Sequence, residues 1–208
     1  RSHPALVAGI SEQAARLDHV LFAGATHEPA VQLAEELLQV VPDGLSRVFY
    51  SDDGSTAVEA AIKMVLQSWV HRDQPERRVF LAMDGAYHGD TFGAMAASDP
   101  DPFFLPFQPL MFEVRRVAAT QESLRAALED LGDRAAGFIL EPLLQGAAGM
   151  RVMPVAFVQQ ARQLCDQYGI PLVADEVMTG FGRTGAMFAC ELAGISPDIM
   201  CLAKGLTG

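Results

Sequence analysis

The chain has 208 residues, with 15 lysines and arginines against 26 acids and a formal net charge of −11. Half of the residues are hydrophobic and 20% are charged, which is typical of a globular protein rather than a disordered one. No run of Lys and Arg forms the basic face that a nucleic-acid-binding protein needs. The sequence contains no stretch of about 18 apolar residues, which is the length needed to span a membrane. We therefore expect one large domain, or slightly more, that acts on small molecules and has no nucleic-acid or membrane partner.

Three cysteines, Cys165, Cys190 and Cys201, are an odd number and form no Cys-x-x-Cys pair. We interpret them as buried thiols in a reducing compartment, not as a disulfide framework or a metal site. This predicts a cytoplasmic protein without a metal. The chain begins inside a predicted helix and stops directly after its last predicted strand. That is typical of a piece of a longer protein, and a naturally short protein is the alternative.

Apolar residues at helical spacing predict two N-terminal helices, at residues 6–17 and from Pro29 to the turn at 42–44. Residues 47–50 are predicted to form a short strand. A polar turn then leads into a long helix over residues 56–71.

The remaining sequence alternates between strands and helices. Strands are predicted at residues 79–82, 110–114, 137–140, 171–174 and 199–202, and helices at 88–97, 120–131 and 154–169. Residues 99–107, which contain three prolines, are the longest irregular stretch.

Strands that are apolar throughout, separated by amphipathic helices, predict an α/β fold with a mostly parallel sheet and helices on both faces. We expect residues 1–45 to form an N-terminal helical segment and residues 46–208 to form the large domain. Ligands of such sheets bind at the carboxyl ends of the strands. The chemistry is therefore expected in the segments that directly follow strands.

The first such segment is the turn at Gly54, Ser55 and Thr56, before the long helix. Gly54 allows close backbone approach, and free amides at a helix N-terminus attract an anion, so the turn is a candidate phosphate site. An ordinary helix cap is the alternative, because Ser, Thr and Asp are common caps. The neighbouring acids Asp52 and Asp53 would repel a phosphate unless they are turned away.

Two further strand ends carry unusual residues. Tyr87 lies between Gly85 and Gly89 and could lie flat on a planar ring, or it could be a half-buried tyrosine of a loop. Glu141 directly follows an apolar strand, and Gln145 comes four residues later. Burying an unpaired carboxylate is expensive, so Glu141 is either part of a structural ion pair or a site residue.

Asp175 and Lys204 follow the last two predicted strands. An ionised Asp175 at the edge of the sheet needs a cationic partner. A lysine partly buried among apolar groups loses its charge more readily and becomes a nucleophile, whereas a surface lysine is the alternative. An anion site, a flat aromatic ring, an acid and a nucleophilic lysine are together the parts that an enzyme using pyridoxal 5'-phosphate (PLP) needs.

Residues 175–185 read Asp-Glu-Val-Met-Thr-Gly-Phe-Gly-Arg-Thr-Gly, which resembles a motif of the class III (ω-) aminotransferases. Residues 197–199 and 203–205 resemble the lysine motif of the same family. The turn at 54–59, the Tyr-His-Gly at 87–89 and the Glu-Pro at 141–142 follow in the family's order, so the resemblance covers nearly the whole chain.

The resemblance implies PLP as cofactor, a PLP fold type I large domain, and a homodimer with shared active sites. Lys204 would carry PLP as a Schiff base, and Asp175 would pair with the pyridine nitrogen. Val177 and Tyr87 would contact the two faces of the PLP ring. The phosphate would be bound by Gly54, Ser55 and Thr56, and the groups near the imine would be Glu141 and Gln145. Arg183 would lie near the substrate entrance, and Tyr87 and Asp90 would also face substrate.

Within the family, residues 22–30, 48–64 and 87–95 resemble a branch that uses S-adenosylmethionine as amino donor in biotin biosynthesis. The carboxylate of Asp90 would favour such a cationic donor, although it could instead cap a helix. The alternatives are another class III enzyme of the ornithine, GABA or acetylornithine type, and an inactive PLP-binding fragment.

Overall fold

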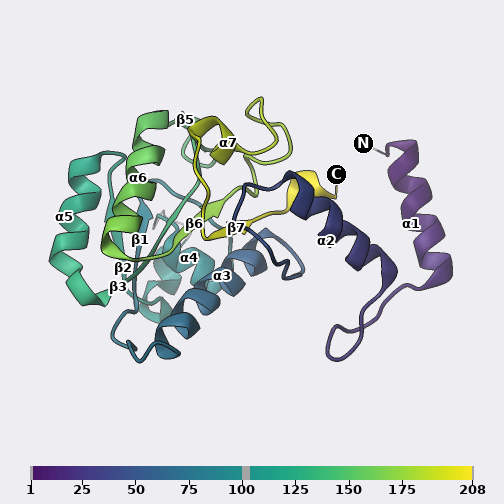
Figure 1. The fold of residues 1–208 in the computed structure, drawn as a ribbon, viewed down its shortest axis with the longest axis horizontal. Coiled ribbons are helices and arrows are strands. Elements are labelled where there is room, and N and C mark those ends of the chain that lie inside the picture. The colour runs from purple at the N-terminus through teal and green to yellow at the C-terminus, as the bar shows by residue number, and fades with distance from the viewer. Residues whose placement is uncertain (1, 100–103, 208) are drawn as a thin grey trace.

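The computed structural model describes residues 2–99 and 104–207 and has a parallel sheet at its centre (Figure 1). Five strands run in the order β2-β1-β3-β6-β7, and every neighbouring pair is parallel. Their bounds are Val79–Met83 (β1), Val114–Val117 (β2), Ala135–Leu140 (β3), Leu172–Asp175 (β6) and Ile199–Cys201 (β7). A small antiparallel hairpin, β4 (Leu144–Gln145) with β5 (Arg151–Val152), follows β3. The predicted α/β class with a mostly parallel sheet is confirmed.

Helices cover both faces of the sheet. α3 (Gly54–Val70) packs with α4 (Phe92–Ala97), while α5 (Gln121–Leu131) packs with α6 (Val155–Tyr168), and α6 with α7 (Ala189–Ala193). From β2 onward, each strand of this sheet (β3, then β6, then β7) lies further across it in the same direction. Right-handed crossovers therefore place α5, α6 and α7 on one face, and the opposite step from β1 to β2 places α4 on the other. Three 3-10 helices complete the described elements: η1 (Leu105–Leu110), η2 (Gly132–Arg134) and η3 (Lys204–Leu206).

The core lies around β1, β3 and β6, in which every residue is buried. Phe80 and Phe138 are fully buried, and burying a side chain of this size stabilises the fold by about 1.5–3 kcal/mol. On α3, the indole Nε1 of Trp69 donates a 2.7 Å hydrogen bond to the carbonyl of Ala136 in β3. This bond joins the long helix to the centre of the sheet.

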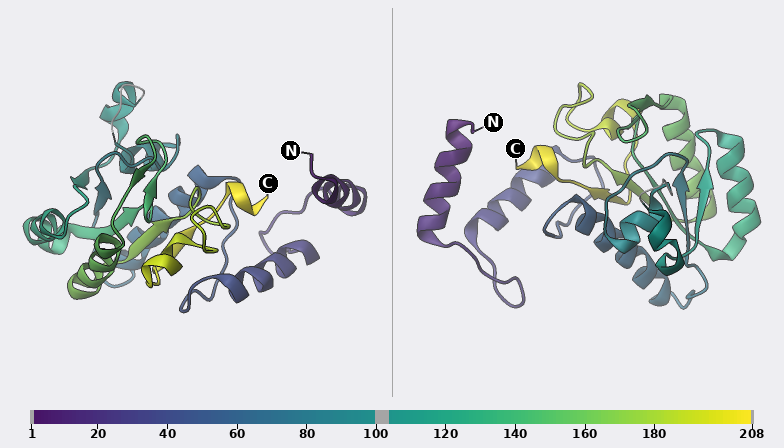
Figure 2. Two further views of the ribbon diagram at one scale, coloured as in Figure 1. Left: turned by 90° about the horizontal axis from the view of Figure 1, so that it is seen from above. Right: turned by 180° about the vertical axis from the view of Figure 1, so that it is seen from behind.

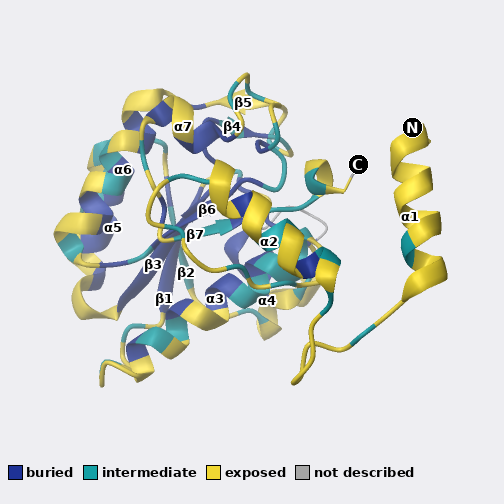
Figure 3. Ribbon diagram, turned by 45° about the vertical axis from the view of Figure 1, so that its right-hand side comes forward, coloured by how far each residue is buried: buried dark blue, intermediate teal, exposed yellow. Residues whose placement is uncertain are grey.

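The two N-terminal helices stand apart from this core (Figures 1 and 2). α1 (Pro4–Arg16) and α2 (Glu28–Val40) each begin with a histidine N-cap and a proline in the first turn. α1 buries none of its residues, and α2 buries Ala30 and Leu37, so their surfaces are largely exposed (Figure 3). Among the described residues, we find no helix with both the length and the apolar content to cross a membrane.

One predicted strand is absent. Residues 47–50 form no regular element, although the hydroxyl of Tyr50 donates a 2.5 Å hydrogen bond to the carbonyl of Ala30 on α2. A cavity of about 530 Å³ is lined both by this segment and by β7. A run with high strand propensity becomes a strand only beside a partner backbone, and this segment does not pair with β7, whose hydrogen-bonded neighbour is β6.

Another prediction is displaced along the chain. The strand expected at 110–114 is β2, and it begins only at Val114. The start of the predicted range, Leu110, is instead the last residue of η1. The charged residues Arg115 and Arg116 interrupt the apolar pattern by which strands were predicted. β2 lies at the edge of the sheet, where a strand tolerates polar residues. Of the stretch predicted to be irregular, residues 100–103 lie outside the described part, and residues 105–110 form η1.

The three cysteines are buried and unpaired, as predicted. Burial raises the pKa of the Cys165 thiol to about 12, and it also raises the pKa values of Cys190 and Cys201. These thiols therefore stay protonated and contribute to packing.

Candidate active site

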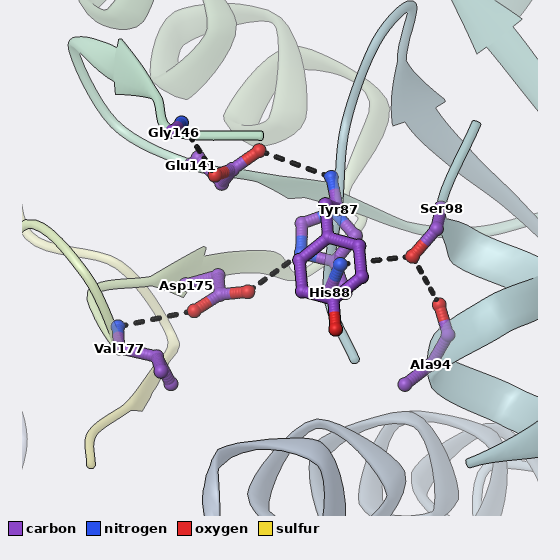
Figure 4. Close-up of polar contacts among 8 residues, drawn as sticks. All are labelled: Tyr87, His88, Ala94, Ser98, Glu141, Gly146, Asp175 and Val177. Atoms are coloured by element: carbon purple, nitrogen blue, oxygen red, sulfur yellow. Dashed lines mark hydrogen bonds and ion pairs between the residues drawn. The ribbon is translucent and has the colours of Figure 1, made fainter. Parts of the chain in front are cut away.

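The carboxyl edge of the sheet brings together the segments that follow β1, β3, β6 and β7. His88 contacts Asp175, and the Tyr87 amide contacts Glu141 (Figure 4). Gly54, at the start of α3, lies against Val177 and Ala203. Segments that are far apart in the sequence therefore meet where ligands of parallel sheets bind.

Asp175 is the last residue of β6, and its side chain is 5% exposed. Its Oδ2 lies 2.6 Å from Nδ1 of His88, whose side chain is fully buried. Its Oδ1 accepts a 3.1 Å hydrogen bond from the amide of Val177. The sequence predicted a cationic partner for this acid, and the structure places an imidazole from the segment after β1 beside it.

Glu141 lies one residue beyond β3 and is 4% exposed. Its two carboxylate oxygens accept hydrogen bonds from the amides of Tyr87, at 3.1 Å, and Gly146, at 3.3 Å. Burial raises the pKa of Glu141, while the hydrogen bonds from these two amides oppose the rise. The carboxyl group therefore ties the loop after β1 to the turn after β3.

Gln145 is fully buried, and both ends of its amide are engaged. Nε2 donates a 3.2 Å bond to the carbonyl of Asp84, and Oε1 accepts a 2.7 Å bond from Nε of Arg151. The side chain thus holds the hairpin β4–β5 against the end of β1.

Tyr87 lies at the rim of this edge, with 37% of the residue exposed. Its ring stacks on Phe104, with centroids 6.2 Å apart and planes 15° apart. Its hydroxyl donates a 2.9 Å bond to Oδ1 of Asp90. The alternative interpretation of Asp90 as a helix cap is wrong, because α4 has Thr91 as its N-cap residue and no side-chain cap bond.

The turn before α3 serves two purposes. Asp53 caps the helix through a capping box, in which the amide and the hydroxyl of Thr56 both bond with Asp53. The Ser55 hydroxyl bonds with the hydroxyl and the amide of Thr91, at 2.8 and 3.0 Å. The capping alternative therefore holds for Asp53 and Thr56. The amides of Gly54 and Ser55 remain at the helix N-terminus, where no carbonyl of the same helix can accept from them.

Three segments also meet at Gly54. A Cβ atom at this position would lie 2.8 Å from Cγ1 of Val177 and 3.4 Å from Cβ of Ala203. The first contact is too short for real side chains, so only glycine fits here. The absence of this one carbon lets the first turn of α3 lie against the segments after β6 and β7.

Lys204 lies three residues after the end of β7 and is the first residue of η3. Its φ of 47° is in the left-handed region. The expectation that its side chain is partly buried is wrong for the described chain, because the residue is exposed. The backbone of Ala203 reaches the site, but no described element packs over Lys204. Arg183 is likewise exposed, on the turn that follows β6.

The profile of the family described as Aminotransferase class-III matches residues 1–208. The chain belongs to the class III aminotransferases. Its curated relatives include the adenosylmethionine-8-amino-7-oxononanoate aminotransferase of Synechococcus elongatus, which is 52% identical over all of the chain and 52% of the relative. The protein of that name from Geobacter sulfurreducens is 43% identical over 95% of the chain and 48% of the relative. The chain thus spans about half the length of these relatives.

Solved structures of class III transaminases have the same fold. The adenosylmethionine-8-amino-7-oxononanoate aminotransferase of Methanocaldococcus jannaschii superposes with a TM-score of 0.94 at 34% identity, covering 99% of the chain and 49% of that protein. An amine transaminase from an uncultivated Pseudomonas species, solved in its PLP-bound form, gives 0.90 at 31% identity, covering 99% and 51%.

Sequence reasoning missed two buried polar residues of this class III chain. His88 lies within the Tyr-His-Gly motif at residues 87–89, but nothing in the sequence marked it as the partner of Asp175. Glu176 is fully buried, bonds with the hydroxyl of Thr179, and accepts from the amides of Ala189 (3.0 Å) and Cys190 (2.7 Å). It anchors the turn after β6 to the start of α7. A second acid next to Asp175, within an apolar context, was the signal for it.

Proposed function

We propose that this chain is the cofactor-binding part of a PLP-dependent aminotransferase. In this proposal the whole protein moves an amino group from S-adenosylmethionine to 8-amino-7-oxononanoate, giving 7,8-diaminononanoate in biotin biosynthesis. The observation that carries the cofactor assignment is the buried carboxylate of Asp175 at the carboxyl edge of the sheet, where Val177 of the same segment lies against Gly54 of α3. The substrate pair is supported by the names of the relatives that are up to 52% identical.

The residues at this edge fit PLP. The absence of a Cβ atom at Gly54 lets the first turn of α3 lie against Val177, and the amides of Gly54 and Ser55 at this helix N-terminus suit a phosphate group. We assign the phosphate to these two residues and not to Thr56, whose amide and hydroxyl are taken by the capping box. Asp175 would pair with the ring nitrogen, and Val177 and Tyr87 would bound the two faces of the ring. Glu141 and Gln145 would shape the cavity wall.

When bound, PLP supplies an aldehyde carbon that captures amines and a pyridine ring that takes up electrons as the substrate carbon loses its proton. Lys204 would bind that carbon through Nζ in the resting enzyme. Once displaced by substrate, the neutral Nζ would take the proton from the substrate carbon and return it. Asp175 would hold the proton on the ring nitrogen.

The rim of the site suits a cationic amino donor. The Asp90 carboxylate is exposed and is oriented by the Tyr87 hydroxyl, so it can attract a positive charge without being buried. We propose Tyr87 and Asp90 as donor contacts and Arg183 as a residue of the substrate entrance.

We also propose that the protein is a homodimer with shared active sites, and that the chain divides at residue 45. α1 exposes Leu6, Val7 and Ile10 and buries nothing, so it has an apolar surface for a second copy to cover. Ile10→Asp in the whole protein should then shift the dimer toward monomer in light-scattering measurements. A dimer of unchanged stability would exclude this surface.

The buried, unpaired cysteines suit the cytoplasm, which we propose as the location of the protein.

The amino donor is tested by a single half-reaction. The purified whole protein, loaded with PLP, is mixed with a stoichiometric amount of S-adenosylmethionine alone. We expect the visible absorbance of bound PLP to disappear, and 7,8-diaminononanoate to be detected by mass spectrometry once 8-amino-7-oxononanoate is added. If ornithine, GABA or alanine removes the absorbance and S-adenosylmethionine does not, the substrate assignment is wrong.

A further inference from the structure

The side chain of His88 is fully buried at the edge of the sheet, and the proposed function gives it no task. We propose that His88 is a positioning residue, whose neutral imidazole donates its Nδ1–H to Asp175 and keeps that carboxylate ionised and oriented for the ring nitrogen of PLP. This inference rests on the proposed function.

The geometry leaves Asp175 no freedom to turn. His88 Nδ1 lies 2.6 Å from Oδ2, and the amide of Val177 lies 3.1 Å from Oδ1 (Figure 4). An N–O distance this short is typical of a hydrogen bond in which one partner carries charge. Because each oxygen has its own donor, the plane of the carboxylate is fixed from two sides.

His88 is itself held in place. Its amide donates a 2.8 Å bond to Oγ of Ser98, and Ser98 Oγ donates a 2.8 Å bond to the carbonyl of Ala94 on α4. The imidazole is thus placed by the helix on one face of the sheet, while Asp175 is placed by β6. The bond between them joins two elements that are 87 residues apart in sequence.

The surroundings of the second ring nitrogen indicate which protonation state the imidazole has. An ionised carboxylate only accepts, so the proton of the imidazole lies on Nδ1. His88 Nε2 is buried and has no hydrogen-bond partner among the described residues. A proton there would create a buried, unpaired cationic N–H, whereas the neutral ring leaves only an unpaired lone pair. The neutral form with Nδ1–H is therefore favoured.

The net charge of the pair decides its use. A neutral imidazole leaves the His88–Asp175 pair with a charge of −1, which complements a protonated pyridine nitrogen. An imidazolium would cancel that charge. Among the described residues, Glu141, after β3, and Cys201, on β7, also interact with this pair, and burial favours the neutral form of both.

The experiment compares PLP with an analogue in which carbon replaces the ring nitrogen. Both carry the same aldehyde and phosphate, so the ratio of their Kd values isolates the interaction at the nitrogen. It is measured by titration of the whole protein and of two matched variants. His88→Asn places an amide N–H near the position of Nδ1, whereas His88→Gln places it near Nε2, out of reach of Asp175.

We expect the native protein and His88→Asn to prefer PLP over the analogue. His88→Gln should lose about tenfold or more of that preference, which is the size of a lost charge-assisted hydrogen bond. In an Asp175→Asn background, His88→Gln should leave the ratio unchanged, because its effect passes through Asp175.

The outcomes separate two failures. If His88→Gln weakens both ligands equally, or His88→Asn and His88→Gln behave alike, His88 has only a structural role and the inference is overturned. If the native protein binds neither ligand, or does not distinguish them, the proposed function itself fails. Thermal unfolding without ligand is recorded for each variant, so a loss of folded protein is recognised separately.

Discussion

The interior of the sheet and its β7 edge differ in how firmly they hold their polar residues. β3 and β6 lie between hydrogen-bonded neighbours, and the acids at or just after their ends, Asp175 and Glu141, are buried with two hydrogen bonds each. β7 has β6 as its hydrogen-bonded neighbour on one side, and Lys204 beyond it is exposed. Both ends carry residues that the family resemblance assigns to the cofactor. The difference shows that burial and partners, not position after a strand, hold a side chain in a fixed geometry.

The largest expected effect is at the exposed end. Lys204→Ala should abolish covalent attachment of PLP and transamination, because no other amine takes its place, yet the free energy of unfolding should change by less than about 0.5 kcal/mol, as for other surface positions. Borohydride reduction of the PLP-loaded protein, followed by peptide mapping, locates the attachment. The matched control is Lys63→Ala, an exposed lysine on α3. Label on Lys63 in the native protein would refute the assignment.

The core should respond in the opposite way. Phe138→Ala removes a fully buried ring from β3 and should lower the free energy of unfolding by about 3–5 kcal/mol. Ile10→Ala on the exposed face of α1, where the residue is 71% exposed, should change it by less than about 0.5 kcal/mol in the monomer. Urea unfolding of both variants measures the contrast. Equal losses would mean that α1 belongs to the cooperative core.

Asp175→Asn tests the polar end of the interior. The amide has the same shape but cannot hold the proton on the ring nitrogen, so turnover should fall by about 100- to 1000-fold, as when one preorganised electrostatic contact is lost. PLP should remain bound through Lys204 and the phosphate. Steady-state kinetics and the absorbance of bound PLP measure the two effects, with the exposed Asp73→Asn as control. Near-normal turnover would contradict the role of Asp175.

The smallest effect concerns Glu141 and pH. Burial raises the pKa of Glu141 above its ordinary value of 4.5, so the folded state favours the protonated form. The stability that this contributes is fully present below pH 4.5 and is lost as pH rises through the folded-state pKa. Relative to Glu141→Gln, which cannot titrate, the native protein should therefore lose free energy of unfolding as pH rises. A difference between the two proteins that does not vary with pH would contradict a raised pKa.

Particular residues show what could be predicted of the site. Because parallel strands end at one edge, the sequence was sufficient to place Glu141 and Asp175 there, and both are found buried at that edge. The partner of Asp175 could not be predicted, because His88 lies in a polar loop 87 residues away and no local pattern distinguishes it. The dual use of the α3 turn was left open by the sequence for a related reason. The same residue types cap a helix and bind an anion, and the hydrogen bonds of Asp53 and Thr56 decide between these uses.

The sequence by itself determined the parallel α/β sheet, its main helices and the family. Apolar runs such as β3 and the periodic stripe of α5 are local signals, and a motif such as residues 175–185 survives in any context. Tertiary structure alone decided that residues 47–50 remain unpaired, that His88 joins Asp175, and that Lys204 is exposed. The physical reason is the same in all three cases. Strand pairing, the satisfaction of a buried charge and the burial of a lysine each depend on a partner from a distant part of the chain, which a local pattern does not encode.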